Sequence, residues 1–291
     1  MQTESLDRFT GLSGLRKWLP FAVAVITVAI TALLLPRVLP RYGQEVPQYT
    51  LTLEECSGTL TILYDNNPYE ESCLPEWGFS CLVELEDKTI LFDTGGDSEA
   101  FAHNINALGV EITEIDCIVL SHEHWDHVGG IDIVLDANPG VSVYLPETFP
   151  FHIKSNIRVK GATVVETSDA TVICEGVATT RVLDANPDEQ ALIINTPFGL
   201  ILVTGCSHPG VENLARDALN LTGGEICLAV GGFHLGGATR TQLGLLVEEM
   251  KELGVLKIAP THCSGDLARQ VFREGYGDDC LDVGVGFSMG F

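Results

Sequence analysis

Three histidines and one aspartate stand within six consecutive positions, and no other feature restricts the possible folds of this chain so strongly. The stretch runs from His122 to His127 in the order H-x-H-x-D-H, directly after an apolar run at residues 116–121. Neutral imidazole and carboxylate suit zinc, iron and manganese. The whole chain has only 8 histidines, so a chance polar loop explains this cluster poorly. Alternation along the loop would aim His122 and His124 one way and Asp126 with His127 another, which predicts ligands for two metal ions.

Strand-like and helix-like segments alternate around this loop. Apolar, β-branched runs predict strands at residues 59–63, 80–85, 89–95, 116–121, 141–146, 191–196, 200–205, 225–232 and 257–260, with more β structure in 162–183. Helical spacing of apolar residues predicts helices at 97–109, 211–219 and 239–253, and a short helix from Ser264. This order predicts one α/β domain over residues 49–291, with two sheets and helices on their outer faces. Residues just past the strand ends would then meet at one edge, where ligands usually bind.

The first 44 residues differ from the rest in charge and hydropathy. They hold five basic and two acidic residues, whereas the whole chain holds 16 basic and 40 acidic residues and a formal net charge of −24. Residues 18–36 contain no charged residue and match the ~20 residues of a bilayer-spanning helix. We therefore expect a tail at 1–17, a transmembrane anchor at 18–36, a linker at 37–48 and a single-pass membrane protein whose domain is extracytoplasmic. A cleaved signal peptide is the alternative, but LLLP at 33–36 offers no cleavage site.

Composition also limits the ligands. The chain has no Lys/Arg cluster of the kind that binds nucleic acid, and no G-x-G-x-x-G or P-loop follows a strand, so we expect a small-molecule substrate. The nine cysteines are scattered without a C-x-x-C pair, which argues against a zinc ribbon or a disulfide scaffold. In an oxidising compartment Cys56, Cys73 and Cys81 would be the first to pair, whereas Cys117 and Cys227 are expected to be core thiols. The oligomeric state stays open.

The H-x-H-x-D-H loop after a strand resembles the hallmark of the metallo-β-lactamase superfamily, and the resemblance covers most of residues 59–265. Asp93-Thr94-Gly95 is similar to that family's early aspartate-bearing turn, and Pro260-Thr261-His262 is similar to its last metal histidine. Within the superfamily, the chain resembles one branch, which includes dihydropterin ribofuranosyl-aminobenzene phosphate synthases. The residues that carry this resemblance are 66–68 (NNP), 76–79 (EWGF), 204–210 (TGCSHPG), 232–235 (GFHL) and 261–265 (THCSG). The resemblance implies an αββα sandwich with two metal ions at the strand ends.

Two positions depart from the family pattern. The family's metal-bridging aspartate follows the strand at 200–205, where this chain has Cys206, which could be a metal ligand or a buried inert thiol. The third histidine of the first metal has no counterpart before residue 191, where residues 187–190 read PDEQ. His208, two residues beyond Cys206, could fill that vacancy, and Asp188 or Glu189 could serve as carboxylate substitutes.

The expected ligands therefore form two groups. The first ion would be held by His122, His124 and His208, and the second by Asp126, His127 and His262, with Cys206 as a further candidate. Zinc is the default expectation, with manganese or iron as alternatives. A hydroxide shared by the two ions would attack the substrate, because coordination lowers the pKa of water from ~15.7 towards ~7. Asp126 would position this nucleophile, and His234 could protonate the leaving group. Asp93 is expected to orient a ligand histidine rather than to bind metal.

Three functions compete on this basis. Hydrolysis of a phosphoester or a related ester is the first, because an exported domain fits poorly with cytoplasmic cofactor synthesis. The second is synthase chemistry on a phosphorylated ribose substrate, which the resemblance implies. The third is a membrane-bound sensor that holds metal or ligand without turnover, which the cysteine at position 206 leaves open.

Overall fold

The computed structural model describes residues 50–291. The tail, the transmembrane anchor and the linker expected at residues 1–48 lie outside the described residues. Between residues 50 and 291, no helix combines the length and the apolar character that a membrane crossing requires.

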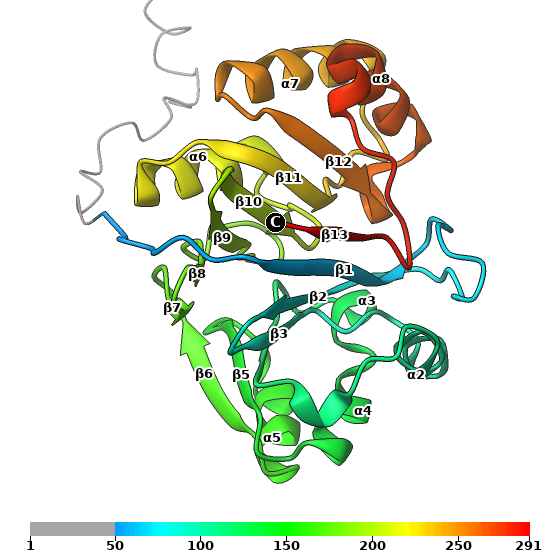
Figure 1. Ribbon diagram of the computed structural model, residues 1–291, viewed down its shortest axis with the longest axis vertical. Helices are drawn as coiled ribbons and strands as arrows, with labels where there is room; N and C mark the ends of the chain where they lie inside the picture. Colours follow the sequence, from blue (N-terminus) through cyan, green and yellow to red (C-terminus); the bar gives the residue numbers. More distant parts are fainter. Residues whose placement is uncertain (1–49) are drawn as a thin grey trace, which may run out of the picture. The chain divides into compact units, whose positions relative to one another are not determined.

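Two β-sheets lie face to face, and helices cover both outer surfaces (Figure 1). The first sheet has seven strands in the order β13-β1-β2-β3-β4-β5-β6, and the second has six in the order β12-β11-β10-β9-β8-β7. The first sheet contains β1 (Gly58–Asp65), β2 (Phe79–Leu85), β3 (Thr89–Phe92), β4 (Cys117–Val119), β5 (Ser142–Pro146), β6 (Thr163–Thr167) and β13 (Ser288–Gly290). The second contains β7 (Val172–Cys174), β8 (Val177–Thr179), β9 (Leu192–Thr196), β10 (Gly199–Thr204), β11 (Ile226–Gly232) and β12 (Lys257–Thr261). The predicted α/β sandwich of two sheets is confirmed.

Three apolar clusters hold these layers together. Residues such as Ile62 of β1 and Val203 of β10 fill the space between the sheets. The first sheet packs against α2 (Ser98–Ala107), α4 (Ile131–Ala137) and α5 (Phe151–Val159). The second sheet packs against α6 (Val211–Thr222), α7 (Arg240–Glu252) and α8 (Asp266–Tyr276). Each sheet therefore buries both faces, as strands with near-continuous apolar sequences require.

Local capping explains where the helices begin. Asp97 ends the turn after β3, and its side chain accepts a hydrogen bond of 2.8 Å from the Ala100 amide, which starts α2. Thr239 and Gln242 form a capping box at the start of α7. Along α7 the side chains of Leu243, Val247 and Met250 are buried, which agrees with the expected apolar face.

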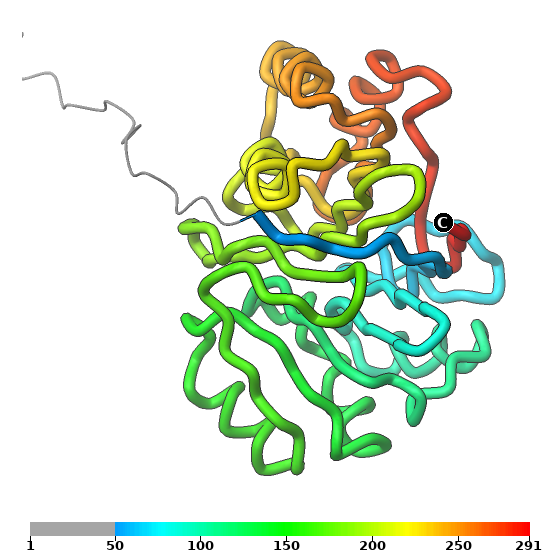
Figure 2. The backbone as a smooth tube through the Cα atoms, turned by 60° about the vertical axis from the view of Figure 1, so that its left-hand side comes forward, coloured from blue at the N-terminus to red at the C-terminus, as the bar shows by residue number. Residues whose placement is uncertain are grey.

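Several elements were missed from the sequence. The sequence pattern predicts no helix at residues 150–158, but α5 begins after Pro150 and buries only Ile157, so its apolar periodicity is too weak to recognise. The last strand, β13, has only three residues and pairs with β1. In Figure 2 the C-terminal segment (red) returns to lie beside the loop after β1, where the Glu70 amide donates to the Val285 carbonyl at 3.0 Å.

All nine cysteines lie in the described part of the chain, and all are free thiols. The pairing considered for Cys56, Cys73 and Cys81 does not form. Cys81 is buried among the apolar side chains between the sheets, whereas the Cys56 thiol donates to the Asn195 carbonyl at 3.3 Å. Cys117 is buried, as expected, and Cys227 is half-buried.

Candidate metal centre

The ends of several parallel strands bring the candidate residues together. Strands β3 and β4 are parallel neighbours, and so are β10, β11 and β12. Asp93 follows β3, the H-x-H-x-D-H loop follows β4, and the turn at 205–208 follows β10. His234 and His262 follow β11 and β12. Because parallel strands in one sheet end at the same edge, five separate stretches of sequence converge on one site.

Four residues at these strand ends have an unusual backbone. Asp93, Ser207, His234 and His262 are the non-glycine residues with positive φ in the described chain, with φ values of 55°, 62°, 51° and 47°. Each such conformation costs on the order of 1–3 kcal/mol unless its surroundings enforce it. Strain of this kind gathers where side chains must be aimed for function. The backbone thus marks the same edge as the histidines.

The first donor group consists of His122, His124 and His208. One nitrogen from each ring lies within 4.8 Å of the others. The rings of His122 and His208 have centroids 4.6 Å apart, and His122 is fully buried, whereas His124 is exposed. This is the first set of ligands expected from the sequence, and the structure brings it together.

The second donor group consists of Asp126, His127, Cys206 and His262, whose ligand atoms also lie within 4.8 Å of one another. His127 Nε2 lies 3.2 Å from Cys206 Sγ, and His262 Nε2 lies 3.4 Å from Asp126 Oδ2. All four side chains are buried. Cys206 is therefore placed among the donors rather than in an apolar core.

The histidines are oriented in a way that suits metal binding. The Nδ1 atom of His208 lies 2.8 Å from Glu189 Oε2, that of His262 lies 2.9 Å from Asn66 Oδ1, and that of His122 lies 2.9 Å from Ser121 Oγ. The opposite atom, Nε2, is buried in all three and has no hydrogen-bond partner. A buried polar atom without a partner is costly, and a ligand histidine typically binds metal through one nitrogen while a protein group holds the other. The donor set therefore fits divalent metal ions.

The carboxylate of Asp93 links the two donor groups. Its Oδ2 accepts from Ser121 Oγ at 2.6 Å and lies 2.7 Å from His127 Nδ1, while its Oδ1 accepts from the Ser121 amide at 2.7 Å. Burial raises the pKa of Asp93 to about 7 and lowers the pKa of His127 to about 3. Neutral imidazole is the form that binds a metal. Asp93 thus contacts His127, one of the histidines expected to bind metal.

Glu189 has a structural role here. It is fully buried, and its carboxylate accepts hydrogen bonds of 2.8 Å from the amides of Cys206, Ser207 and His208. These contacts outweigh the effect of burial and, together with the neighbouring His122, hold the pKa of Glu189 below its usual range. Glu189 therefore holds the turn and the ring of His208 in place, and the other substitute considered, Asp188, bonds through its carboxylate to the Ala185 amide at 3.0 Å.

The remaining histidines are placed as follows. The ring of His234 is exposed, and its centroid lies 4.5 Å from that of His208, at the entrance to the donor groups. His103 is exposed on α2 and its Nε2 lies 3.0 Å from the Ser72 carbonyl. His152 is exposed on α5. Neither His103 nor His152 belongs to a donor group of the described chain.

Comparison with known proteins agrees with this geometry. Residues 78–262 match the family model described as "Metallo-beta-lactamase superfamily". The chain belongs to the metallo-beta-lactamase superfamily.

Relatives within this superfamily carry different names. The 7,8-dihydropterin-6-methyl-4-(beta-D-ribofuranosyl)-aminobenzene-5'-phosphate synthase of Methanocaldococcus jannaschii is 29% identical, and the match covers 75% of this chain and 91% of the relative. An uncharacterised protein of the same organism is 31% identical, over 71% of this chain and 90% of its own length. Among solved structures, Tm1679, a metal-dependent hydrolase of the beta-lactamase superfamily, is 25% identical with a TM-score of 0.68, over 80% of this chain and 98% of that one.

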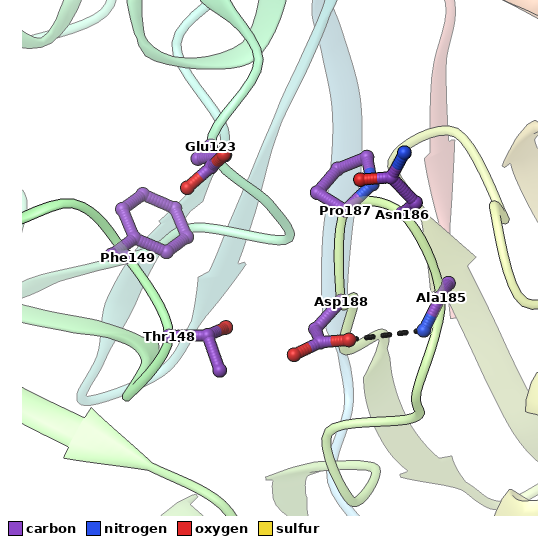
Figure 3. Close-up of a pocket in the computed structure, with 7 residues that line it drawn as sticks. All are labelled: Glu123, Thr148, Phe149, Ala185, Asn186, Pro187 and Asp188. Carbon is purple, nitrogen blue, oxygen red and sulfur yellow. Dashed lines mark hydrogen bonds between the residues drawn. The ribbon is translucent and has the colours of Figure 1, made fainter.

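Two cavities adjoin the metal centre of this metallo-beta-lactamase domain. One, of about 180 Å³, lies beside Glu123 of the H-x-H-x-D-H loop at residues 122–127, which is called the metal loop below. Figure 3 shows the carboxylates of Glu123 and Asp188 facing this cavity from different loops. The other, of about 390 Å³, is lined by His208, His234 and apolar side chains of α7.

Proposed function

We propose that the protein is a metal-dependent hydrolase that uses two divalent ions, with zinc as the default metal, to cleave an ester or a phosphoester. The observation that carries this proposal is the convergence of two donor groups in which three buried Nε2 atoms have no hydrogen-bond partner. His122, His124 and His208 would hold one ion, and Asp126, His127, Cys206 and His262 the other. When bound, the ions would supply Lewis acidity and lower the pKa of bound water from ~15.7 towards ~7.

Side chains of the protein itself would position the water molecule and the substrate. Contacts with His262 and His127 outweigh burial and hold the pKa of Asp126 below its usual range, so this carboxylate is anionic and can orient a water molecule. His234 lies at the entrance with an exposed ring, within reach of a substrate that touches His208. It is the group from which a leaving alkoxide would take its proton.

The charges around the centre bear on the class of substrate. The cavity beside the metal loop presents Glu123 and Asp188, and the cavity along α7 presents Glu212 and Glu249. No lysine or arginine of residues 50–291 lines either one. A polyanionic substrate would meet like charges there, which disfavours its binding. This favours substrates with at most one negative charge near the scissile bond, such as lactones, carboxylic esters and phosphodiesters.

A second candidate function is synthase chemistry on a phosphorylated ribose. It is favoured by the synthase of Methanocaldococcus jannaschii, which matches this chain over 91% of its own length. The same donor groups would serve either reaction, because both require a polarised substrate oxygen. Substrate assays separate the two functions.

The test begins with metal-free protein that is reloaded with zinc, manganese or iron. Each form is assayed on phosphomonoesters, phosphodiesters, lactones, thioesters and phosphorylated ribose compounds. Asp126→Asn should lower kcat/KM for the best substrate by at least ~10²-fold, because it removes a charged group from the centre. Asp136→Asn is the matched control, since Asp136 is exposed on α4 and pairs with Lys160. Loaded wild-type protein that turns over none of these compounds, yet binds one tightly, would identify a sensor instead of an enzyme.

A further inference from the structure

The thiol of Cys263 lies beside the second donor group, and the proposed two-metal mechanism does not use it. Its Sγ lies 3.3 Å from Cys206 Sγ and also accepts a hydrogen bond of 3.3 Å from the His234 amide. Cys263 is only 8% exposed. The ligand atoms of Cys206, Cys263 and His234 form a third group within 4.8 Å of one another. Two thiols and an imidazole thus meet here, and the proposed function gives Cys263 no role.

Sheet topology shows how the two thiols come into contact. Cys206 follows β10 and Cys263 follows β12, and β11 lies between these strands. Strands that are second neighbours are roughly 9–10 Å apart, too far for two thiols to touch across an ordinary residue. The middle strand ends at Gly232, where an added Cβ would lie 2.7 Å from Cys263 Sγ. The missing side chain therefore leaves the space in which the thiols meet.

His234 completes this arrangement from the same middle strand. It stands two residues beyond Gly232 with a φ of 51°, a conformation that an L-residue adopts only under constraint. That conformation brings its imidazole within reach of both thiols, while the ring keeps contact with solvent. Two sulfur donors and one nitrogen donor form a set that zinc and softer cations prefer over oxygen-rich sets.

We propose that Cys206, Cys263 and His234 form a third cation site for a soft metal such as zinc or cadmium, with the Cys206 sulfur shared between this site and the second metal. Binding there replaces the protons of the coordinating thiols, which are released to solvent. Because His234 is exposed, water would complete the coordination of the ion. If the proposed function holds, loading this site also takes His234 away from proton transfer, and excess soft metal inhibits the enzyme.

Metal stoichiometry tests the site without any assay of turnover. Metal-free protein is titrated with Cd²⁺ and Co²⁺, while native mass spectrometry counts the bound ions and absorbance follows thiolate-to-metal charge transfer. Wild type should bind three ions, and Cys263→Ser should bind two with weaker charge-transfer absorption. Cys280→Ser is the matched control, because Cys280 is 9% exposed and lies in the apolar cluster beneath α8. This variant should still bind three.

A second variant tests the site even if Cys263→Ser fails to fold. His234→Gln alters an exposed ring and should keep the fold while weakening the third ion by about 10-fold or more. Saturation of wild type at two ions, or equal loss of the third ion in Cys280→Ser, would overturn the site. Turnover is measured separately, with two ions bound and with three. Binding of three ions without turnover at either loading would defeat the proposed function and leave the third site standing. Turnover by protein that saturates at two ions would defeat the third site and leave the proposed function standing.

Discussion

Replacing Glu189 by glutamine tests how the centre is held together. The two carboxylate oxygens of Glu189 accept four hydrogen bonds of 2.8 Å, from the amides of residues 206–208 and, in the tautomer that leaves Nε2 free, from His208 Nδ1. A glutamine oxygen can still accept at one end, but its NH₂ group would face two N–H donors at the other. Each lost hydrogen bond to a charged group is worth ~1.5–3 kcal/mol, so the variant should lose ~3–6 kcal/mol of unfolding free energy.

The same change should weaken metal binding. Without an acceptor at Nδ1, the His208 ring can rotate away from His122 and His124, and affinity for the first ion should fall about 10–100-fold. Urea unfolding of the metal-free protein measures the stability loss, and competition with a chromophoric chelator measures the affinity. Affinity for the second ion should fall less, because only Cys206 of its four donors is hydrogen-bonded to Glu189, and through its backbone amide.

A surface glutamate provides the control. Glu166 also accepts two charged hydrogen bonds of 2.8 Å, from Lys154 and Arg158, but it is exposed. Glu166→Gln should therefore cost at most ~1 kcal/mol. Equal stability losses in the two variants, or unchanged affinity for the first ion in Glu189→Gln, would refute the reasoning.

Three further predictions concern other parts of the chain. Asn66→Ala should weaken the second ion by about 10-fold or more in chelator competition, since Asn66 holds Nδ1 of His262; unchanged affinity contradicts this. Gly205→Ala should cost ~1–3 kcal/mol in urea unfolding, because its Cβ would lie 2.1 Å from Ser121 Oγ, whereas Gly140→Ala, which meets nothing within 4 Å, should be near neutral. The membrane anchor expected at residues 18–36 predicts that a chain starting near Gln44 folds without detergent. If that fragment aggregates while the full chain stays soluble without detergent, residues 18–36 belong to the core instead.

Most strands, most helices and the histidine loop at residues 122–127 could be predicted from the sequence because these features are local. An apolar run such as residues 200–204 can be recognised without knowledge of its neighbours, and the histidine loop concentrates its chemistry in six residues. Contacts between distant stretches could not be predicted in this way. Asn66 meets His262 across 196 positions, and Cys263 meets Cys206 across 57. Such residues come together only because two specific strand ends lie side by side. No local pattern in a single sequence encodes which strand ends do so.

The two departures from the superfamily pattern are linked in the structure. The turn at 206–208 contributes one residue to each donor group, Cys206 to the second and His208 to the first. The stretch that lacks the expected third histidine, residues 187–190, contains Glu189, whose carboxylate accepts hydrogen bonds from the backbone of this same turn and lies 2.8 Å from His208 Nδ1. The carboxylate of Glu189 therefore holds His208, the residue expected to replace the missing histidine. Glu189→His should therefore fail to restore a familiar ligand set, because the added imidazole would free the histidine that now completes the first group.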